Sequence, residues 1–523
     1  MDFESLSKQL AVYVGDFNAN DADAGKEKRD IPNGDVLEWM RSNIPLVDFP
    51  DKVMERAYYF RWWSFRKHIR KTPDGYVITE FLADVPWAGK HNTINCAAGH
   101  HFNEGRWIKN TEYLEQYLSF WFEGGGSIRS YSFWVADSAY RQYLVSGNIN
   151  PLMRYFSDFI NNYKAWEESH GEDNGLFWQV DDREGMELSM AGAGLRPTVN
   201  SYMYAEAKAI AAIARLLGEE SQTELFEAKA ARIKEQMLAL LWDTEMKFFK
   251  TYVTEKHREI QKKKYAHHSD RENTYVDQPL GLHPVPELFG YAPWCYGVMD
   301  DVPAGDYLKA WRYITDPDYF AGPVGLATAP MSHPHFIRHH RHECAWDGPT
   351  WPYATCQALG AMARMLRNDA KSEAPVTARD YMKLMNQYAA MHRLPLSKGA
   401  EPVDWIDENY DPRSGALLAR DRLYEWNDAN KDRGQYYNHS TFCDLVISDV
   451  IGLSCDENGQ ITVQPLAVDW PYFLLSGVSM RGSEIAVMYD RDGTRYGKGS
   501  GLAVFRDGQE VGRLKELGRL TIS

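Results

Sequence analysis

Two stretches near the middle of the chain decide the fold: VNSYMYAEAKAIAAIARLL at residues 199–217 and QTELFEAKAARIKEQMLALLW at residues 222–242. In both, apolar residues return every three or four positions, which predicts amphipathic α-helices. Only four residues separate the two stretches. They are therefore expected to pack side by side as a helical hairpin.

The same apolar spacing returns along most of the chain. It occurs at residues 53–70, 104–122, 137–145, 153–168, 307–314, 353–367, 378–392 and 441–453. Gly- and Pro-rich loops separate these segments, so we expect about ten to twelve helices in series. Helical hairpins closed into a ring, with function in the loops at one end, fit this order better than an open bundle.

The pattern changes after residue 453. Short alternating runs split by Gly and Asp turns predict strands at residues 461–468, 472–478, 484–489, 502–505, 511–514 and 520–522. These strands predict a small β-sandwich behind the helices. The turn-rich first fifty residues are expected to form an arm or a small β segment. The predicted domains are thus an N-terminal arm (1–51), a helical catalytic domain (52–455) and a C-terminal β-sandwich (456–523).

Composition limits the function. The chain of 523 residues has a formal net charge of −15, which argues against nucleic acid or an anionic membrane as partner. Its six cysteines lack the spacing of a zinc site or disulfide framework. No metal or cofactor is expected, and the oligomeric state is open. Localisation also stays open between the cytoplasm and, if a signal peptide has been removed, the periplasm or the cell exterior.

Acidic and aromatic residues gather in four loop stretches, at residues 124–140, 181–189, 344–352 and 405–415. Sugars present hydroxyl groups and C–H faces, so a sugar site needs carboxylates together with Trp or Tyr. Hydrolysis of a glycosidic bond also needs two carboxyl groups, one protonated and one ionised. The four stretches therefore predict one carbohydrate-cleaving pocket.

The first stretch, GGGSIRSYSFWVADSAY, resembles the first signature of trehalases. Arg129, Tyr131, Trp134 and Asp137 take the places of its arginine, aromatic, tryptophan and aspartate, with two extra residues before Asp137. The resemblance implies that these four side chains bind substrate.

The second stretch contains GMELS at residues 185–189, which resembles the trehalase segment Gly-Trp-Asp-Phe-Ser. In that family the Asp is the general acid, and Glu187 stands in its place here. Because the carboxyl group is one methylene longer, Asp182 stays open as the alternative acid. Trp178, close to these acids, is expected to line the cleft.

The third stretch contains WDGPTWP at residues 346–352, which resembles the second trehalase signature and the Trp-Arg-Gly-Pro-x-Trp string of α-glucosidase I relatives. It has one residue fewer between Pro and Trp than the trehalase form. The resemblance implies that Trp346, Asp347 and Trp351 build the sugar subsites.

The fourth stretch, with Glu408, Tyr410 and a following Pro and Gly, resembles the segment whose Glu activates water in the same enzymes. Glu425 is the rival base, because α-L-rhamnosidases place theirs in a Trp-Glu-Arg-Trp string ahead of Asn-His. Here the Asn-His pair ends in His439. Glu408 is favoured, and Tyr410, His439 and Glu425 are candidates for substrate binding.

These resemblances identify the chain with the trehalase, α-glucosidase I and mannosylglycerate hydrolase-like group of inverting (α/α)6 glycosidases. They imply an all-α (α/α)6 barrel with a small C-terminal β-sandwich. The implied activity is an exo-acting α-glycoside hydrolase with Glu187 as acid and Glu408 as base, acting on a carbohydrate.

Two other functions stay open. One is an α-L-rhamnosidase-like hydrolase with Glu425 as base. The other is a polysaccharide lyase on a similar helical toroid, with His339, His340 and Arg341 facing a uronate; a sugar-binding protein without catalysis is a weaker third. The His-rich segment 332–343 lacks zinc-site spacing, so we interpret it as a wall of the pocket.

Overall fold

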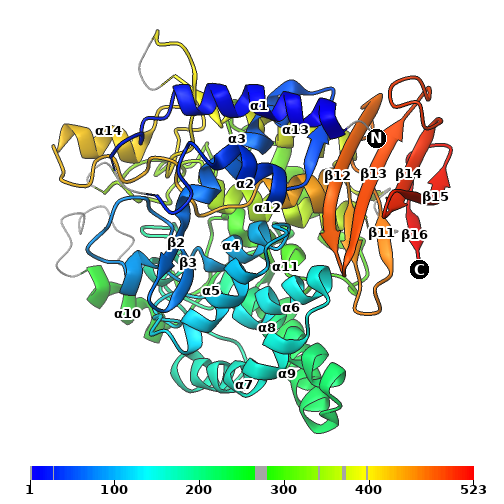
Figure 1. Ribbon diagram of the computed structural model, residues 1–523. Coiled ribbons are helices and arrows are strands. Elements are labelled where there is room, and N and C mark those ends of the chain that lie inside the picture. The colour runs from blue at the N-terminus through cyan, green and yellow to red at the C-terminus, as the bar shows by residue number, and fades with distance from the viewer. Residues whose placement is uncertain (1–2, 27–28, 266–278, 340–341, 368–372, 396–398) are drawn as a thin grey trace.

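The computed structural model describes residues 3–26, 29–265, 279–339, 342–367, 373–395 and 399–523. The chain is rich in helices, and its C-terminal strands gather at one side (Figure 1). The predicted central hairpin is present as α8 (Pro197–Leu217) and α9 (Glu220–Leu240). Pro197 opens α8, and Gly218, with φ of 75°, ends it in the left-handed conformation that glycine adopts without strain.

Most of the other predicted helices are present within a few residues of the expected bounds. They are α3 (Lys52–His68), α5 (Glu112–Phe122), α6 (Val135–Ser146), α7 (Asn150–His170), α12 (Pro352–Leu366) and α13 (Ala378–Ala390). The helix α4 (Ala98–Gly105) was not predicted. Segment 307–314 lies in a 3-10 helix, Gly305–Thr315. Segment 441–453 contains the short α15 (Cys443–Leu445), a π-helical turn (Val446–Val450) and then a strand.

The expected helix over residues 104–122 is instead two helices. Both Arg106 and Trp107 donate hydrogen bonds to Oδ1 of Asp444, which ties the chain down just after α4. The chain then turns back, and a Cβ on Gly105 would lie 3.0 Å from Leu114 of α5. The polar anchor and this close approach explain a break that the apolar spacing alone does not reveal.

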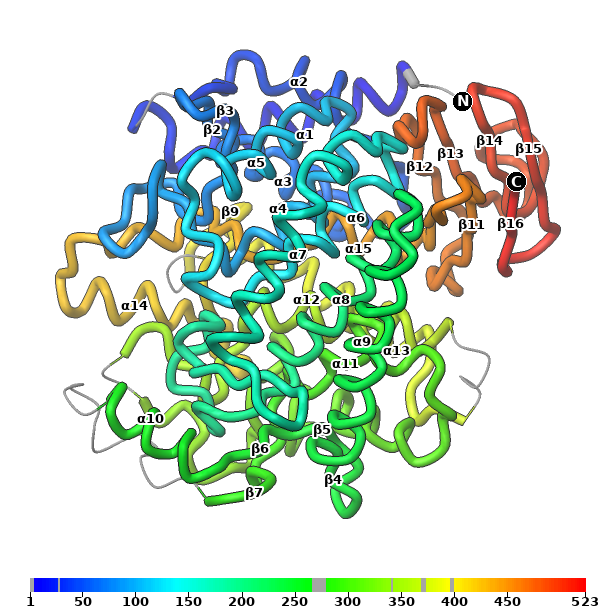
Figure 2. The backbone as a smooth tube through the Cα atoms, turned by 90° about the horizontal axis from the view of Figure 1, so that it is seen from below, coloured from blue at the N-terminus to red at the C-terminus, as the bar shows by residue number. Residues whose placement is uncertain are grey.

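Six helical elements contact one another in a closed cycle. In order they are α4, α6, α8, α11 (Ala292–Cys295), α12 and α15, and α15 contacts α4 again. A further set, α3, α5, α7, α9 and α13, contacts members of this cycle. Figure 2 shows the helical elements over most of the molecule, with the C-terminal strands at one edge.

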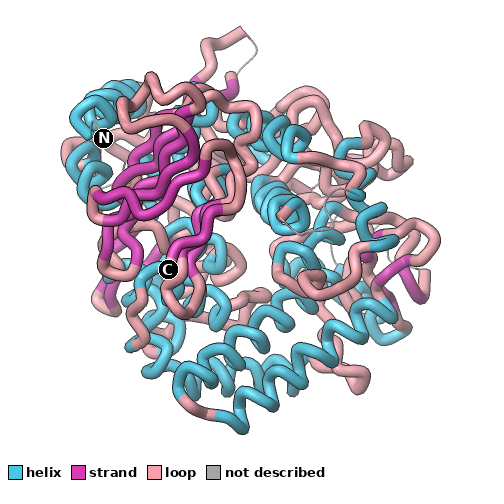
Figure 3. Tube along the Cα trace, turned by 90° about the vertical axis from the view of Figure 1, so that its right-hand side faces the viewer, coloured by secondary structure: helices cyan, strands magenta, loops and turns pink. Residues whose placement is uncertain are grey.

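The C-terminal strands form two antiparallel sheets, of order β1-β12-β13-β14-β15 and β10-β11-β16 (Figure 3). Their bounds are β1 Leu46–Asp48, β10 Leu453–Cys455, β11 Ile461–Val463, β12 Tyr472–Met480, β13 Ser483–Asp490, β14 Gly501–Arg506, β15 Gln509–Leu514 and β16 Leu520–Ile522. The predicted Asp507–Gly508 hairpin is present, with positive φ at both residues. The expected strands are thus present, and one strand joins them from the N-terminal part of the chain.

The N-terminal part differs from the expected arm. It contains α1 (Phe3–Ala19) and α2 (Val36–Asn43) before β1. Leu6, Leu10, Val14 and Phe17 of α1 recur at helical spacing and are buried, and α1 contacts α3. Because turn residues follow α1 in the sequence, the segment was interpreted as an arm and this helix was not predicted.

Candidate active site

A cavity of about 220 Å³ opens at one end of the helical elements. Its described lining residues are Glu80, Phe81, Trp87, Ile94, Cys96, Tyr131, Asp182, Gly185, Glu187, His342, Glu343, Cys344, Trp351, Tyr353, Arg433, Tyr437 and His439. We call this cavity the acidic pocket, because four of these side chains carry carboxyl groups.

The element order explains why residues so distant in sequence meet in the acidic pocket. Nearly all of them lie in a segment just before, or in the first turn of, a member of the helical cycle. Cys96 precedes α4, Tyr131 precedes α6, Glu187 precedes α8, Trp351 caps α12 and His439 precedes α15. The starting ends of these five elements therefore face one place, and all four predicted stretches come close to it.

Glu187 lies in the wall of the acidic pocket. Its backbone carbonyl accepts a hydrogen bond from the Trp346 amide at 2.9 Å, which joins the second and third predicted stretches. Burial, and then the neighbouring charges of Asp182 and Asp181, raise the pKa of Glu187 well above its usual value. The next residue, Leu188, has a φ of 58°, a strained conformation of the kind that clusters at functional sites.

Glu408 lies directly behind the lining. It is 1% exposed, and Arg433 holds its carboxylate with Nε at 2.6 Å from Oε1 and Nη2 at 3.2 Å from Oε2. The Cys344 thiol donates to Oε2 at 3.5 Å. Arg433 also donates to Glu343 at 3.0 Å. Burial alone would raise the pKa of Glu343, but the charges of Arg433 and then His342 outweigh burial and lower this pKa.

The lining residues that were not among the predicted site residues include Glu80, Arg433 and Tyr437. The Tyr437 hydroxyl donates to Oε1 of Glu80 at 2.5 Å. Burial raises the pKa of Glu80 to about 8, against this hydrogen bond and assisted by the Glu408 charge. Glu80 lies inside the largely apolar run VITEFLA at residues 77–83, in which it is the one acid, and this was the available signal. Tyr437 and Arg433 stand just before the Asn-His pair.

Several predicted binding residues lie outside the acidic pocket. Arg129 is exposed, and its Nη1 donates to Asn162 at 3.1 Å. Glu425 is exposed at the end of α14 (Leu418–Glu425). Trp178 packs against the rings of two histidines and under Lys256. Asp137 pairs with Arg141 at 2.6 Å, in a different cavity.

The structure buries four other predicted binding residues: Trp346, Tyr410, Trp134 and Asp347. Trp346 stacks on Trp351 with ring centroids 4.7 Å apart. Of the two, Trp351 lines the acidic pocket and Trp346 lies behind it. Tyr410 accepts a hydrogen bond from the Asp407 amide. Trp134 packs on Tyr202 at 4.4 Å. The motifs thus also supply the layer beneath the site.

Asp347 is likewise buried, and it holds the His-rich segment. Its Oδ2 accepts from the backbone amides of Arg338 and His339 and lies 2.8 Å from Nδ1 of His339. Beyond residues 340 and 341, His342 and Glu343 line the acidic pocket, as expected if this segment is a wall of the pocket. His340 and Arg341, invoked for a lyase, lie outside the described residues.

A second cavity, of about 790 Å³, lies further along the same helices. Ion pairs line it, including Arg106–Asp444 at 2.6 Å and Arg367–Asp449 at 2.7 Å. Glu187, the predicted acid, lines the smaller cavity and not this one. His100 and Tyr353, with ring centroids 4.5 Å apart, separate the two cavities.

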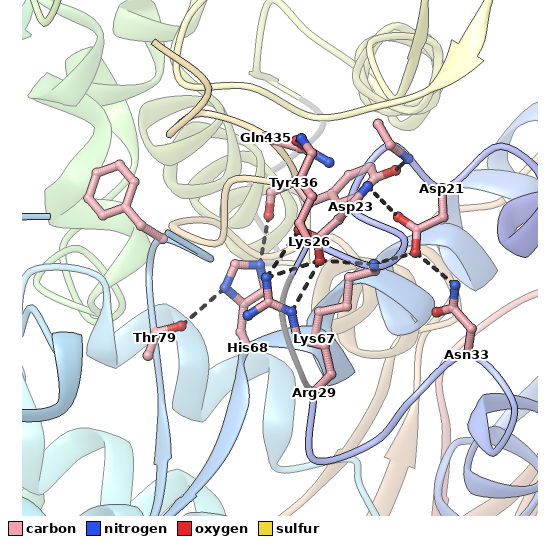
Figure 4. Close-up of polar contacts among 12 residues, drawn as sticks. Asp21, Asp23, Lys26, Arg29, Asn33, Lys67, His68, Thr79, Gln435 and Tyr436 are labelled. Atoms are coloured by element: carbon pink, nitrogen blue, oxygen red, sulfur yellow. Dashed lines mark hydrogen bonds and ion pairs between the residues drawn. The ribbon is translucent and has the colours of Figure 1, made fainter. Parts of the chain in front are cut away.

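A polar cluster supports the loop at residues 433–439 from behind (Figure 4). The cluster comprises Asp21, Asp23, Lys26, Arg29, Asn33, Lys67, His68, Gln435 and Tyr436. The Ala22 amide donates to the Tyr436 hydroxyl, Lys26 binds Gln435 at 3.1 Å, and His68 Nε2 lies 2.8 Å from the Tyr436 carbonyl. Tyr436 has a φ of 55°, so the N-terminal segment holds this loop in a strained conformation beside Tyr437.

Residues 90–440, more than half of the chain, match the family model of the mannosylglycerate hydrolase MGH1-like glycoside hydrolase domain. The chain belongs to this family of glycoside hydrolases. The matched region contains α4 to α14 and all but three of the lining residues; Glu80, Phe81 and Trp87 lie before it.

Solved structures agree in fold. One named a sialidase is 32% identical, with a TM-score of 0.85, over 100% of this chain and 46% of its own. The GH78 rhamnosidase of Bacillus sp. GL1 is 12% identical (TM-score 0.53; 90% and 42% covered). The α-L-rhamnosidase of Dictyoglumus thermophilum is 11% identical (TM-score 0.50; 91% and 45%). This chain therefore spans less than half the length of each.

Two kinds of structural feature are absent from the described part of the chain. None of its helices combines the length and apolar character needed to cross a bilayer. Its His, Cys, Asp and Glu side chains form no group of three or more arranged to hold a metal ion.

Proposed function

We propose that the protein is an inverting, exo-acting α-glycoside hydrolase that releases one uncharged sugar, with Glu187 as general acid and Glu408 as general base. The carrying observation is that one small pocket brings together Glu187, whose pKa burial raises, and the carboxylate of Glu408, which Arg433 holds. The α configuration rests on the sequence resemblance to trehalases and α-glucosidase I.

Glu187 suits the acid role because burial and the neighbouring carboxyl groups raise its pKa, which favours its protonated form. It would give its proton to the glycosidic oxygen as the bond breaks. Asp182, the alternative acid, suits this role less well, because its carboxylate is already paired with Lys264 at 2.5 Å.

Glu408 suits the base role because Arg433 holds its carboxylate in one orientation. It would take a proton from a water molecule that attacks the anomeric carbon on the face opposite the leaving group. The sugar configuration inverts, and we expect the two carboxyl groups to stand about 6.5–9.5 Å apart in the complex. Glu425 is exposed on α14, which argues against the rhamnosidase-like alternative.

The size and charge of the acidic pocket indicate the substrate class. Its volume of about 220 Å³ is below the roughly 300–1,000 Å³ of pockets for drug-sized ligands, which suits one sugar ring and exo cleavage. The lining carries four carboxyl groups, and Arg433 is already bound to Glu408 and Glu343. A sugar carboxylate would meet repulsion there, which argues against sialosides, uronides and the lyase alternative.

We further propose that residues 52–455 form an (α/α)6 barrel and residues 456–523 a β-sandwich. The closed cycle of contacts from α4 to α15 and the outer helices support the barrel. The two antiparallel sheets support the sandwich, to which residues 1–51 add strand β1.

The test is a panel of nitrophenyl α- and β-glycosides and α-linked disaccharides, with anomer-resolved NMR on every hydrolysed compound. We expect a neutral α-glycoside to be cleaved with inversion. Glu187→Gln and Glu408→Gln should each lower kcat by at least about a hundredfold, whereas Glu425→Gln should not. Retention of configuration, or a loss confined to Glu425→Gln, would contradict the assignment.

A further inference from the structure

Glu80 is a pocket carboxyl group that neither proton-transfer role uses. It follows directly on β3 (Gly75–Ile78), is 4% exposed and lines the acidic pocket. We propose that Glu80 is a substrate-binding residue that donates a hydrogen bond, in its protonated form, to a ring hydroxyl of the sugar. This inference rests on the proposed function, since it needs a sugar in this pocket.

The contacts of Glu80 hold it in place and leave it a free hydrogen-bonding position. Oε1 accepts from the Tyr437 hydroxyl at 2.5 Å, and the Glu80 carbonyl accepts from the Asn438 amide at 3.1 Å. Among the described residues, the hydrogen-bonding partner of Oε2 is the Cys96 thiol, at 3.8 Å, and a thiol is a weak hydrogen-bonding group. The side chain is therefore fixed through one oxygen, and the other can bind a ligand.

The charges around Glu80 favour its neutral form. Glu408 faces it with a negative charge, while Arg433, the nearby cation, is bound to Glu408 and Glu343. In the described part of the chain, Glu80 takes part in no ion pair. Burial and the Glu408 charge raise its pKa to about 8, against the hydrogen bonds from Tyr437 and Cys96. At neutral pH Glu80 therefore carries a proton that it can donate.

A neutral carboxyl group is useful at this position. Sugar hydroxyl groups both donate and accept hydrogen bonds, so a protonated acid can pair with one without placing another charge beside Glu187 and Glu408. An ionised Glu80 would lose the donor and would repel both carboxyl groups. Substrate binding should therefore weaken as the pH rises through about 8.

The test compares Glu80→Gln and Glu80→Ala with the wild type between pH 5.5 and 9.5, on the best glycoside from the panel. Gln keeps a donor and an acceptor but does not ionise. We expect Glu80→Gln to lower kcat/KM at pH 6 by less than about fivefold and to remove the alkaline rise in KM. Glu80→Ala should raise KM at least about tenfold at pH 6, with a smaller effect above pH 8, and should change kcat less.

Two results would overturn the inference while the proposed function stands. Glu80→Gln might lose all turnover at every pH while folding normally, and Glu80 would then have to act as an ionised base. Alternatively, Glu80→Ala could keep the wild-type KM, and Glu80 would then not contact the sugar. Melting temperatures of both variants check that they are folded.

Sugar binding, measured separately, distinguishes failure of the inference from failure of the proposed function. Isothermal titration calorimetry with glucose, mannose, galactose and rhamnose should give an affinity for at least one sugar that weakens between pH 6 and pH 9 in the wild type but not in Glu80→Gln. If a sugar binds with this pH dependence but no glycoside is hydrolysed, the proposed hydrolysis is overturned and the role of Glu80 in sugar binding is retained. If no sugar binds and no glycoside is hydrolysed, both the role of Glu80 and the proposed hydrolysis are overturned.

Discussion

At the scale of single residues, Asp347 shows how a sugar-site motif can serve the structure instead. Its carboxylate holds two backbone amides and a histidine ring nitrogen of the His-rich segment. We expect Asp347→Ala to lower the free energy of unfolding by about 1–3 kcal/mol, because buried donors lose their partner. Arg129→Ala, which removes one contact of an exposed side chain, should change it by less than about 0.5 kcal/mol. Urea denaturation measures both, and equal effects would contradict the buried role of Asp347.

At the scale of elements, the loop at residues 433–439 depends on the N-terminal segment packed behind it. Tyr436→Phe removes the acceptor of the Ala22 amide, a loss of about 0.5–1.5 kcal/mol. Because the adjacent Tyr437 and Arg433 bind Glu80 and Glu408, we expect kcat/KM to fall a few-fold as well. Tyr424→Phe is the matched control, since it loses a hydroxyl contact to Asp432 outside the acidic pocket. Steady-state kinetics should separate the two variants, and equal activity would argue that the loop needs no such support.

At the scale of the whole molecule, buried acids and histidines make stability depend on pH. Burial raises the pKa values of Glu80, Glu206 and Glu287 to about 8. The folded protein thus keeps protons that the unfolded chain loses above about pH 4.5, and stability falls as the pH rises to about 8. Burial also lowers the pKa values of His100 and His392 to about 3, which costs stability only below about pH 6.5.

Between pH 6.5 and 8.5, therefore, the buried carboxyl groups lower the stability of the fold as the pH rises, and these two histidines do not change it. We expect the melting temperature to fall by a few degrees over this interval. Glu287→Gln, which does not ionise, should make the fall shallower. Calorimetry at constant ionic strength measures the change, and a flat or rising melting temperature would be inconsistent with protonated buried acids.

The amino-acid sequence determined the order of the elements, because a period of 3.6 or 2 residues is a local property of the chain. The α8–α9 hairpin and the strands after residue 453 follow from it directly. Glu187 and Trp351 could also be placed in a sugar site, since each lies in a motif just before a helix of the contact cycle. The break before α5 was not recoverable, because it depends on the contact of Arg106 with the distant Asp444. The apolar residues of α1 do recur at helical spacing, but the turn residues that follow led to the prediction of an arm.

Tertiary structure alone decided which motif residues face the acidic pocket. Trp346 and Trp351 lie five positions apart in one motif, yet one stacks behind the other. Arg129 and Tyr131 are near neighbours, but only Tyr131 reaches the lining. The protonated state of Glu80 likewise arises from burial and from Glu408, 328 positions later in the chain. Side-chain direction and desolvation depend on packing between distant segments, which a local pattern does not encode.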